Sequence, residues 1–401
     1  MEKGLGVFFE AFLKKESVFF DKKVLQSTYI PETIIHRDEQ TRQLANILAP
    51  ALRGDKPSNI FVYGKTGTGK TLTVKHTTKK LMEIAEREQI PLKIIYVNCK
   101  LKRSADTEYR LIAQLARELG KSIPPTGLPT EEVYRTFLKA LNKQNQNHII
   151  ILDEIDQLVD KTGDNVLYNL TRINEEQAES QISIIGISND VMFVDSLDPR
   201  VKSSLSEEEI VFPPYNALQI QYILRQRVEH AFKKDVLEQG VIEKCSAYAA
   251  RDHGDARRAL ELLRVAGELA DRKNSENVTI ENVDDAEQKI DRDRIIDITT
   301  TQPKQYQLVL YSILSSQAQK NNNIFTGEVY EVYKSLCKKI NTNTLTQRRV
   351  SDIISEFDML GIVNAKVISK GRYGRTRDIS IEIPENLMPR VKSILEDNIR
   401  A

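Results

Sequence analysis

Residues 59–71 read NIFVYGKTGTGKT, five apolar or strand-forming residues that run into the pattern GxxxxGK[ST]. Glycines let backbone N–H groups turn inward around phosphate oxygens, and a helix that begins near Lys70 points the positive end of its dipole at them. Lys70 would reach the β- and γ-phosphates, and the Thr71 hydroxyl would bind Mg²⁺. The stretch predicts a buried strand, a helix over 72–84 and, between them, a phosphate-binding loop made of Gly64, Lys65, Thr66, Gly67, Thr68, Gly69, Lys70 and Thr71.

Length and composition indicate a globular chain of several domains. The 401 residues exceed one ordinary core, since a domain holds roughly 100–200 residues, and 40% of them are hydrophobic and 29% charged. Three cysteines lie far apart without CxxC spacing, and five histidines are scattered, so neither a disulfide framework nor a zinc site is expected. No run of about 18 apolar residues occurs, so we expect no membrane association and place the protein in a reducing cytoplasm.

Short apolar runs alternate with longer amphipathic segments up to residue 212, which is the order of a parallel sheet covered by helices. The expected strands, rich in Ile or Val and buried on both faces, are 59–63, 93–97, 148–152, 182–188 and 209–212. Two prolines then end the pattern, and helical periodicity continues to about residue 290. The charged, Thr-rich passage from Asp291 to Gln302 shows no periodic apolar face and is expected to be a linker. We therefore expect three domains, at 1–212, 213–299 and 300–401.

Polar side chains follow two of these expected strands. Asp153 and Glu154 come after the third strand, at the end where α/β sheets place ligands. Asp153 would hold Mg²⁺ through water, and Glu154 would polarise the water that attacks the γ-phosphate. Asn189 follows the fourth strand and would hold the same water or the γ-phosphate. Further on, Arg257 and Arg258 open a helix, and one guanidinium there could fold back onto the phosphates while the other lies on a solvated or salt-bridged face.

The last hundred residues show three segments of helical periodicity followed by two strand-like runs that flank a glycine-containing turn. This is the order of a winged helix-turn-helix, which reads DNA through its third helix and its wing. Residues 301–401 hold 15 Lys or Arg against 10 Asp or Glu, and basic and polar residues gather at both places. The expected DNA contacts are Thr346, Gln347, Arg348 and Arg349 on the helix, and Lys370, Arg372, Tyr373, Arg375 and Arg377 on the wing. A winged helix that binds protein, with a solvated positive tip, is the alternative.

Taken together, the motifs resemble the AAA+ superfamily, and the match to the Orc/Cdc-type replication initiators of archaea is close. Besides the phosphate loop, the resemblance rests on LDEID at 152–156, GISND at 186–190, LDPRV at 197–201 and GDARRAL at 254–260. With the terminal domain it covers nearly the whole chain. It implies an α/β AAA+ ATPase core with a parallel sheet, a helical lid and a C-terminal winged helix-turn-helix domain.

The resemblance also implies residue roles. Asn189 is similar to the sensor-1 residue and Arg257 to the sensor-2 arginine, with Arg258 as the alternative. Arg200 resembles the arginine finger that acts on a neighbour's nucleotide, so an isolated chain should hydrolyse ATP slowly. The region similar to the one that cradles adenine includes Ile30, Arg37 and Tyr222, for which ordinary packing is the alternative. A stretch that resembles a DNA-contacting insertion, although a plain charged loop fits it equally, contains Lys102 and Arg103.

The resulting hypothesis is a replication-origin-binding initiator. It would bind ATP or ADP with Mg²⁺ as a switch, bind double-stranded origin DNA, and recruit an MCM-type replicative helicase, with paralogous initiator subunits as further partners and a nucleoid-associated location. A clamp-loader-like AAA+ ATPase is one alternative, although it would end in a helical collar rather than a winged domain. A signalling or transcription-regulating ATPase with a winged helix is another.

Overall fold

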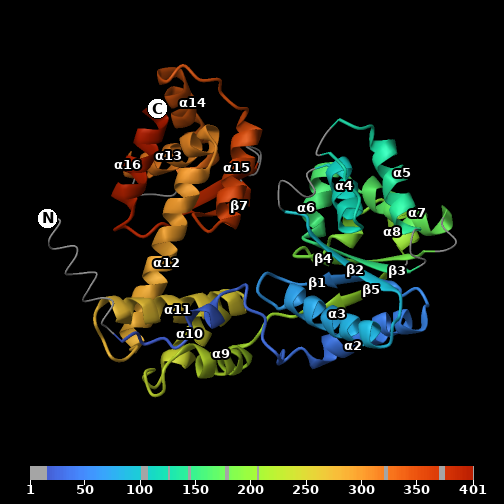
Figure 1. Cartoon of the computed structure of the whole chain (residues 1–401). Coiled ribbons are helices and arrows are strands. Elements are labelled where there is room, and N and C mark those ends of the chain that lie inside the picture. Colours follow the sequence, from blue (N-terminus) through green and yellow to red (C-terminus); the bar gives the residue numbers. More distant parts are fainter. Residues whose placement is uncertain are drawn as a thin grey trace, which may run out of the picture. The chain divides into compact units, whose positions relative to one another are not determined.

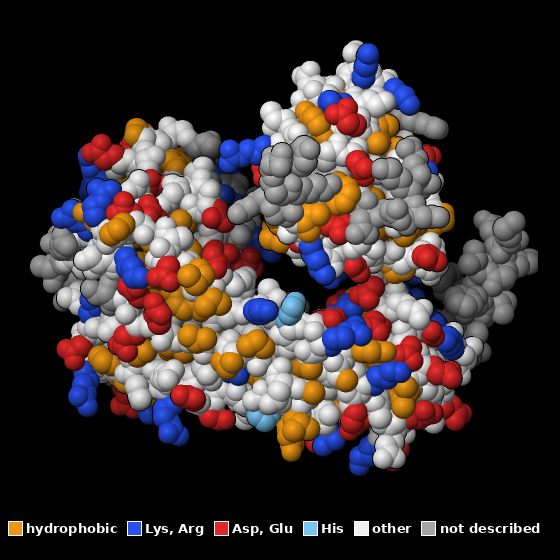
Figure 2. Space-filling view, turned by 180° about the vertical axis from the view of Figure 1, so that it is seen from behind, with side chains coloured by type: hydrophobic (Ala, Val, Ile, Leu, Met, Phe, Trp, Pro, Cys, Tyr) orange, Lys and Arg blue, Asp and Glu red, His pale blue; other side chains and the backbone are white. Residues whose placement is uncertain are grey.

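The computed structural model describes residues 16–100, 107–124, 127–142, 146–176, 180–205, 207–319, 324–369 and 375–400. The chain divides into two compact units, one up to Val283 and one from Asp284 (Figure 1). This division falls inside a helix and not at either of the predicted domain boundaries, 212 and 299, so the three-domain division stays a prediction. On the face drawn in Figure 2, Lys and Arg side chains are interspersed with Asp and Glu, in keeping with a net charge of +1.

The first unit is built on one five-stranded sheet in which all four strand pairings are parallel. Its order is β2–β3–β4–β1–β5, with bounds β1 Asn59–Tyr63, β2 Leu92–Asn98, β3 Asn147–Asp153, β4 Ile182–Ser188 and β5 Glu207–Val211. The first four predicted strands are confirmed to within one residue at each end. Because the strands are parallel, Asp153 and Ser188 end at the same edge of the sheet as Tyr63, the last residue before the phosphate loop.

The prediction that every strand is buried on both faces is wrong for β5. This strand pairs only with β1, and Glu208, Glu209 and Val211 are exposed. An edge strand has a neighbour on one side only, so charged side chains find water there at little cost.

Helices cover both faces of the sheet and enclose two separate apolar cores (Figure 1). On one face lie α2 Asp38–Leu48 and α3 Lys70–Arg87, whose apolar residues pack with the strands and with a 3-10 helix at Ala49–Arg53. The other face is covered by α4 Glu108–Glu118, α5 Thr130–Leu141, α6 Ile155–Thr162, α7 Asn165–Glu176, the 3-10 helix Val194–Ser196 and α8 Pro199–Leu205.

Three helices then form the predicted lid, α9 Ala217–Ala231, α10 Val241–Arg251 and α11 Ala256–Arg272. The N-terminal segment joins them, because a 3-10 helix at Lys22–Leu25 packs on α9 and α11 and the Phe19 ring packs against that of Phe232 with centroids 4.7 Å apart. Residues far apart in the sequence therefore share one small core.

The second unit has the predicted helix–helix–helix–hairpin order, with a helix added at each end and a short strand added between the first and second helices. It contains most of α12 Ile280–Thr301, followed by α13 Lys304–Gln319, β6 Ile324–Phe325, α14 Thr326–Lys339, α15 Gln347–Met359, β7 Val363–Ser369, β8 Arg375–Ile381 and α16 Met388–Arg400. The strands form an antiparallel sheet in the order β6–β8–β7. No strand had been predicted at β6 and no helix at α16.

The prediction of a linker from Asp291 to Gln302 is wrong, since α12 runs through nearly all of it. Within residues 291–302 the buried positions are Ile295 and Thr299, four residues apart, and such a narrow stripe escapes a search for a wide apolar face. None of the helices in the described part of the chain is both long enough and apolar enough to span a bilayer.

Candidate functional site

The phosphate-type loop between β1 and α3 has a backbone that requires its glycines. Gly67 and Gly69 have φ of +71° and +88°, in the region that residues with a Cβ rarely adopt. A Cβ on Gly67 would lie 1.7 Å from Oδ1 of Asp255, which opens the lid helix α11. A Cβ on Gly64 would lie 2.4 Å from the carbonyl oxygen of Phe212. The loop is thus closely packed between the Phe212 backbone on one side and the lid residue Asp255 on the other. Its exposed tip consists of Lys65 and Thr66.

Lys70 is buried beneath this loop, with only 6% of its surface exposed. Its Nζ donates to the carbonyl oxygens of Gly64 (2.6 Å) and Lys65 (2.8 Å) and to Oδ1 of Asn189 (2.9 Å). Burial lowers the pKa of Lys70 to about 8, and the positive charge of Arg257 acts in the same direction. The structure thus brings the predicted lysine and the predicted sensor amide into direct contact across 119 residues of sequence.

Asp153, at the end of β3, faces Thr71 in the first turn of α3. The Thr71 hydroxyl donates to the carboxylate at 3.0 and 3.2 Å, and the carboxylate is buried, with Asp153 only 4% exposed. A second hydroxyl, that of Tyr96 on β2, donates to Asp153 Oδ2 at 2.7 Å. Tyr96 is not among the predicted site residues, because nothing in the sequence around it indicates that its hydroxyl contacts the site.

The donor set at this point fits Mg²⁺ with a nucleotide. Thr71 and Asp153 supply the hard oxygen atoms that Mg²⁺ prefers, but only from one hydroxyl and one carboxylate. Across the described ranges, no three His, Cys, Asp or Glu side chains gather into a group that could hold a metal by themselves. A bound Mg²⁺ would therefore depend on phosphate oxygens for its remaining ligands, as is usual for this ion.

Glu154 follows Asp153 in a left-handed conformation, with φ of +57°, just before α6. Its side chain is 23% exposed and its Oε2 lies 3.5 Å from Nζ of Lys100. The carboxylate that was predicted to polarise water is therefore held by a cation from the end of β2.

A cavity of about 320 Å³ opens beside the loop and is lined by the N-terminal segment, the loop and the lid. Of the predicted residues, Ile30, Gly67, Gly69, Thr71 and Arg257 line it. Its polar and apolar walls also include residues that were not predicted, among them Lys75, Tyr215, Ile223, Gln226, Arg227 and Leu260. Most of these lie on helices, where a single lining residue cannot be told from a core residue by its spacing.

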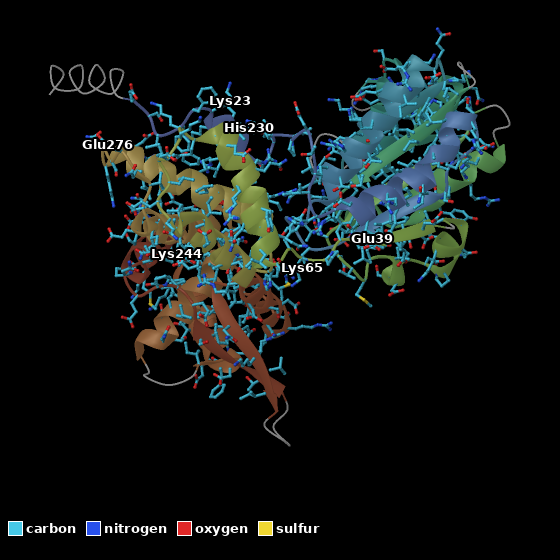
Figure 3. The ribbon with its side chains drawn as sticks, turned by 90° about the horizontal axis from the view of Figure 1, so that it is seen from below. Lys23, Glu39, Lys65, His230, Lys244 and Glu276 are labelled. Carbon is cyan, nitrogen blue, oxygen red and sulfur yellow. The ribbon has the colours of Figure 1, made fainter. Side chains whose placement is uncertain are left out.

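Of the two adjacent lid arginines, Arg257 lines the cavity. Arg258 instead points its Nε at Asp252, 3.7 Å from the Oδ2 atom, with a side chain only 15% exposed. Asp255 caps the helix by accepting from both arginine backbone N–H groups, and Ala256 N donates to the Gly67 carbonyl at 3.3 Å. The lid helix therefore contacts the loop directly through its first turn. Nζ of Lys65, the loop residue labelled in Figure 3, lies 3.4 Å from Nδ1 of His253 in the lid.

Two residues of the predicted adenine region do not line the cavity. Arg37 is 2% exposed, and its guanidinium donates to the carbonyl oxygens of Thr68 (2.9 Å), His36 (3.1 Å) and Pro213 (2.6 Å). Burial lowers its pKa from the usual arginine value. Tyr222 is 55% exposed, with its ring 5.5 Å from that of His36.

Arg200 stands apart from the cavity at the start of α8. Its side chain is 81% exposed and binds both carboxylate oxygens of Asp198, at 3.1 and 3.2 Å. It is not among the residues that line the cavity of its own chain.

In the second unit, a hollow of about 360 Å³ lies between α15 and the hairpin. It is lined by Thr326, Gln347, Arg348, Ser351, Val367, Thr376 and Arg377. Arg377 is fixed there, because its Nε donates to Ser351 Oγ and its backbone N–H to Thr326 Oγ1, both at 3.3 Å. Thr346 caps α15 by accepting from the backbone N–H of Arg349. The predicted third helix and the predicted wing thus place Arg348 and Arg377 in one concavity.

Arg349 lies apart from this hollow. Its Nη2 donates to the Tyr306 hydroxyl at 2.9 Å, and its Nη1 lies 3.6 Å from Glu356 Oε1. Several predicted DNA contacts fall outside the described residues: Lys102, Arg103, Lys370, Arg372, Tyr373 and the side chain of Arg375.

Comparisons with known proteins agree with this architecture. Three family models match successive parts of the chain: an AAA domain at 53–189, a Cdc6 AAA+ ATPase-type lid domain at 221–288, and a CDC6 C-terminal winged helix domain at 297–390. The ORC1-type DNA replication protein 1 of Methanosarcina acetivorans is 50% identical over 98% of this chain and 94% of its own length. That of Pyrococcus furiosus, an ORC1-type DNA replication protein, is 51% identical over 94% of this chain and 90% of its own length.

A solved structure, that of the Aeropyrum pernix ORC1 protein in complex with DNA, is similar throughout. It covers 96% of this chain and 99% of its own, with 44% identity and a TM-score of 0.86. A clamp loader's helical collar is excluded as the third part, since the match at 297–390 is to a winged helix. The chain belongs to the family of ORC1-type DNA replication proteins, AAA+ ATPases that carry a Cdc6-type lid and a C-terminal winged helix.

Proposed function

We propose that this chain is a nucleotide-controlled replication initiator that binds ATP or ADP, with Mg²⁺, in the cavity between loop and lid. One observation carries the proposal: Asp153, Asn189 and Arg257, from three other parts of the sequence, gather at the loop that ends in Lys70 and Thr71. Lys70 and Arg257 would neutralise phosphate charge, and the loop N–H groups would bind phosphate oxygens. Thr71 and Asp153 would hold Mg²⁺, which would supply positive charge against the negative charge that develops during phosphoryl transfer.

In this proposal hydrolysis is slow and the nucleotide acts as a switch. Glu154 is the residue that would orient the attacking water, and its ion pair with Lys100 would compete with that task. Asn189, already in contact with Lys70, would hold the water or the γ-phosphate. Arg200 is exposed and lines no part of its own cavity, which supports a role on the nucleotide of a neighbouring subunit. An isolated chain then lacks the positive charge that accelerates phosphoryl transfer.

We further propose that the winged helix binds double-stranded origin DNA. Gln347 and Arg348 on α15 and Arg377 on β8 line one hollow, in an arrangement suited to groove and backbone contacts. The similar Aeropyrum pernix protein was solved in complex with DNA. Lys102 and Arg103 would add a contact from the first unit. The bound protein would recruit an MCM-type helicase and act beside paralogous initiator subunits.

Nuclease footprinting tests this function. The protein is titrated against duplexes from the replication origin of its own organism and against shuffled duplexes of the same composition. We expect protection of a defined, repeated site at concentrations that leave shuffled DNA open, with the Arg348→Ala variant weakened on both. Equal, diffuse protection of both duplexes would favour the alternative of a regulatory ATPase whose winged helix serves another purpose.

A further inference from the structure

We propose that Tyr96 is a positioning residue for the metal-binding carboxylate, and that it sets how tightly Mg²⁺ is held with the nucleotide. The proposal rests on the function proposed above and adds a residue that lies in β2, outside the phosphate loop and outside the strand that carries Asp153. The Tyr96 hydroxyl donates to Asp153 Oδ2 at 2.7 Å, the shortest of the contacts that the described structure gives this carboxylate.

The two hydroxyl donors, those of Tyr96 and Thr71, make more and shorter hydrogen bonds to one oxygen of the Asp153 carboxylate than to the other. Oδ2 accepts from Tyr96 and, at 3.0 Å, from Thr71, whereas among the described side chains Oδ1 has only the longer 3.2 Å contact with Thr71. Oδ1 is therefore the oxygen with lone pairs available for a metal ion or for a metal-bound water. Partners of this kind fix the orientation of a ligand, and their loss typically costs about 10–100-fold in metal affinity.

Tyr96 is itself positioned twice, by the pairing of its backbone with β3 and by a cation on its ring. Its strand pairs with β3 so that Tyr96 lies beside Ile151 and Asn98 beside Asp153, which brings the tyrosine to the level of the strand end. The ammonium of Lys75, one turn beyond Thr71 on α3, lies 3.7 Å from the centre of its ring. A cation over the ring face is attracted to it and draws electron density from the ring, which makes the O–H a better donor. Lys75 also lines the nucleotide cavity, so the ring is fixed by the same helix that begins at the loop.

The charge of Asp153 makes this contact costly to lose. Asp153 is only 4% exposed, and a buried carboxylate is stable only when its oxygen atoms are hydrogen-bonded. Without Tyr96, Thr71 would be its single side-chain donor among the contacts described, and the carboxylate would be free to turn about its Cβ–Cγ bond. Mg²⁺ demands near-ideal octahedral geometry, so a turned carboxylate weakens its binding.

The test is the substitution Tyr96→Phe, which removes one oxygen atom and keeps the ring. A matched control is Tyr134→Phe on α5, because the Tyr134 hydroxyl also donates to a carboxylate, Glu108 Oε1 at 2.6 Å, and lines no part of the nucleotide cavity. Affinity for a fluorescent ADP analogue is measured over a range of Mg²⁺ concentrations and again in EDTA. Thermal unfolding without nucleotide checks that each variant is folded.

We expect Tyr96→Phe to need about 10–100-fold more Mg²⁺ for half of the Mg²⁺-dependent gain in affinity, with its affinity in EDTA unchanged. Tyr134→Phe should match the wild type in both conditions. A Mg²⁺ midpoint within twofold of the wild type would overturn the inference alone. An equal loss in EDTA would also overturn it, since it would indicate a packing role. If the wild type fails to bind the analogue at all, the proposed function itself is wrong.

Should Tyr96→Phe not fold, Lys75→Met provides a second variant that keeps the hydroxyl and removes the cation from the ring. The expected change is a rise in the Mg²⁺ midpoint in the same direction and of smaller size. An unchanged midpoint in that variant would count against the inference.

Discussion

Replacing Arg37 by methionine tests whether this residue holds the fold together or binds nucleotide. Its guanidinium donates to the carbonyl oxygens of Thr68, in the phosphate loop, and Pro213, at the start of the lid. Its Cζ also lies 3.8 Å from the centre of the Tyr215 ring. Methionine keeps the length of the side chain but leaves both carbonyl groups without this donor. We therefore expect Arg37→Met to destabilise the first unit.

The magnitude follows from the contacts that are lost. The Thr68 carbonyl, whose hydrogen bond to Arg37 is buried, costs about 1–3 kcal/mol when left unsatisfied, and the desolvated cation–π contact contributes about 1–2 kcal/mol. The substitution also removes the cost of burying the guanidinium charge, because Arg37 is only 2% exposed, and this offsets part of the lost stability. A net loss of about 3 kcal/mol would lower the Tm by roughly 6–12 °C, because a unit of this size loses about 2–4 °C per kcal/mol.

The assay is thermal unfolding followed by circular dichroism without nucleotide, with Arg42→Met as the control. Arg42 lies on α2, the helix that Arg37 directly precedes, and is exposed, so its substitution should change the Tm by less than about 1 °C. An unchanged Tm for Arg37→Met, together with a loss of nucleotide affinity of more than tenfold, would refute the reasoning. That result would restore Arg37 to the nucleotide-binding residues.

Three further outcomes are expected. Burial lowers the pKa of Lys70 to about 8, so its ammonium is present below that pH and is lost as the pH rises. ADP affinity measured by calorimetry should therefore fall above pH 8, by up to about tenfold per pH unit. A flat affinity profile up to pH 9 would contradict the placement of this lysine. Glu154→Gln should bind ATP as the wild type does but lose hydrolysis by at least about tenfold, and undiminished phosphate release would exclude Glu154 as the base. Replacing both Arg348 and Arg377 by alanine should weaken DNA binding and reduce the slope of log K against log salt by about one to two, whereas Arg349→Ala, which loses the contact with Glu356, should leave the slope within about 0.5.

Sequence alone predicted the parts of the site that are fixed by local chemistry. The loop from Gly64 to Thr71 follows from residue types that only a phosphate site needs, and the strand that ends at Asp153 follows from a run of Ile and Leu. Because parallel strands end at the same edge, Asn189 could be expected near Lys70, and the 2.9 Å contact confirms that proximity.

What sequence could not supply were contacts decided by packing at long range. Tyr96 meets Asp153 across 57 residues, and its neighbours in sequence are those of any edge strand. Arg37 is predicted to bind nucleotide from the family resemblance and Arg349 to bind DNA from its place on the third helix. The structure gives carbonyl oxygens to one guanidinium and Glu356 to the other, and both roles stay predictions. Whether an arginine forms hydrogen bonds within its own chain or is available for a ligand depends on its neighbours in the fold, and no local sequence pattern encodes those neighbours.

The central claim is that one chain carries two separate sites, for nucleotide at Lys70 and for duplex DNA at Arg348 and Arg377. The most direct measurement is to titrate the wild type, Lys70→Met and the Arg348→Ala, Arg377→Ala double variant with a fluorescent ADP analogue and with a labelled origin duplex. We predict that Lys70→Met loses more than about 100-fold in nucleotide affinity and less than twofold in DNA affinity, and that the double variant shows the reverse. Parallel loss of both affinities in either variant would contradict the claim.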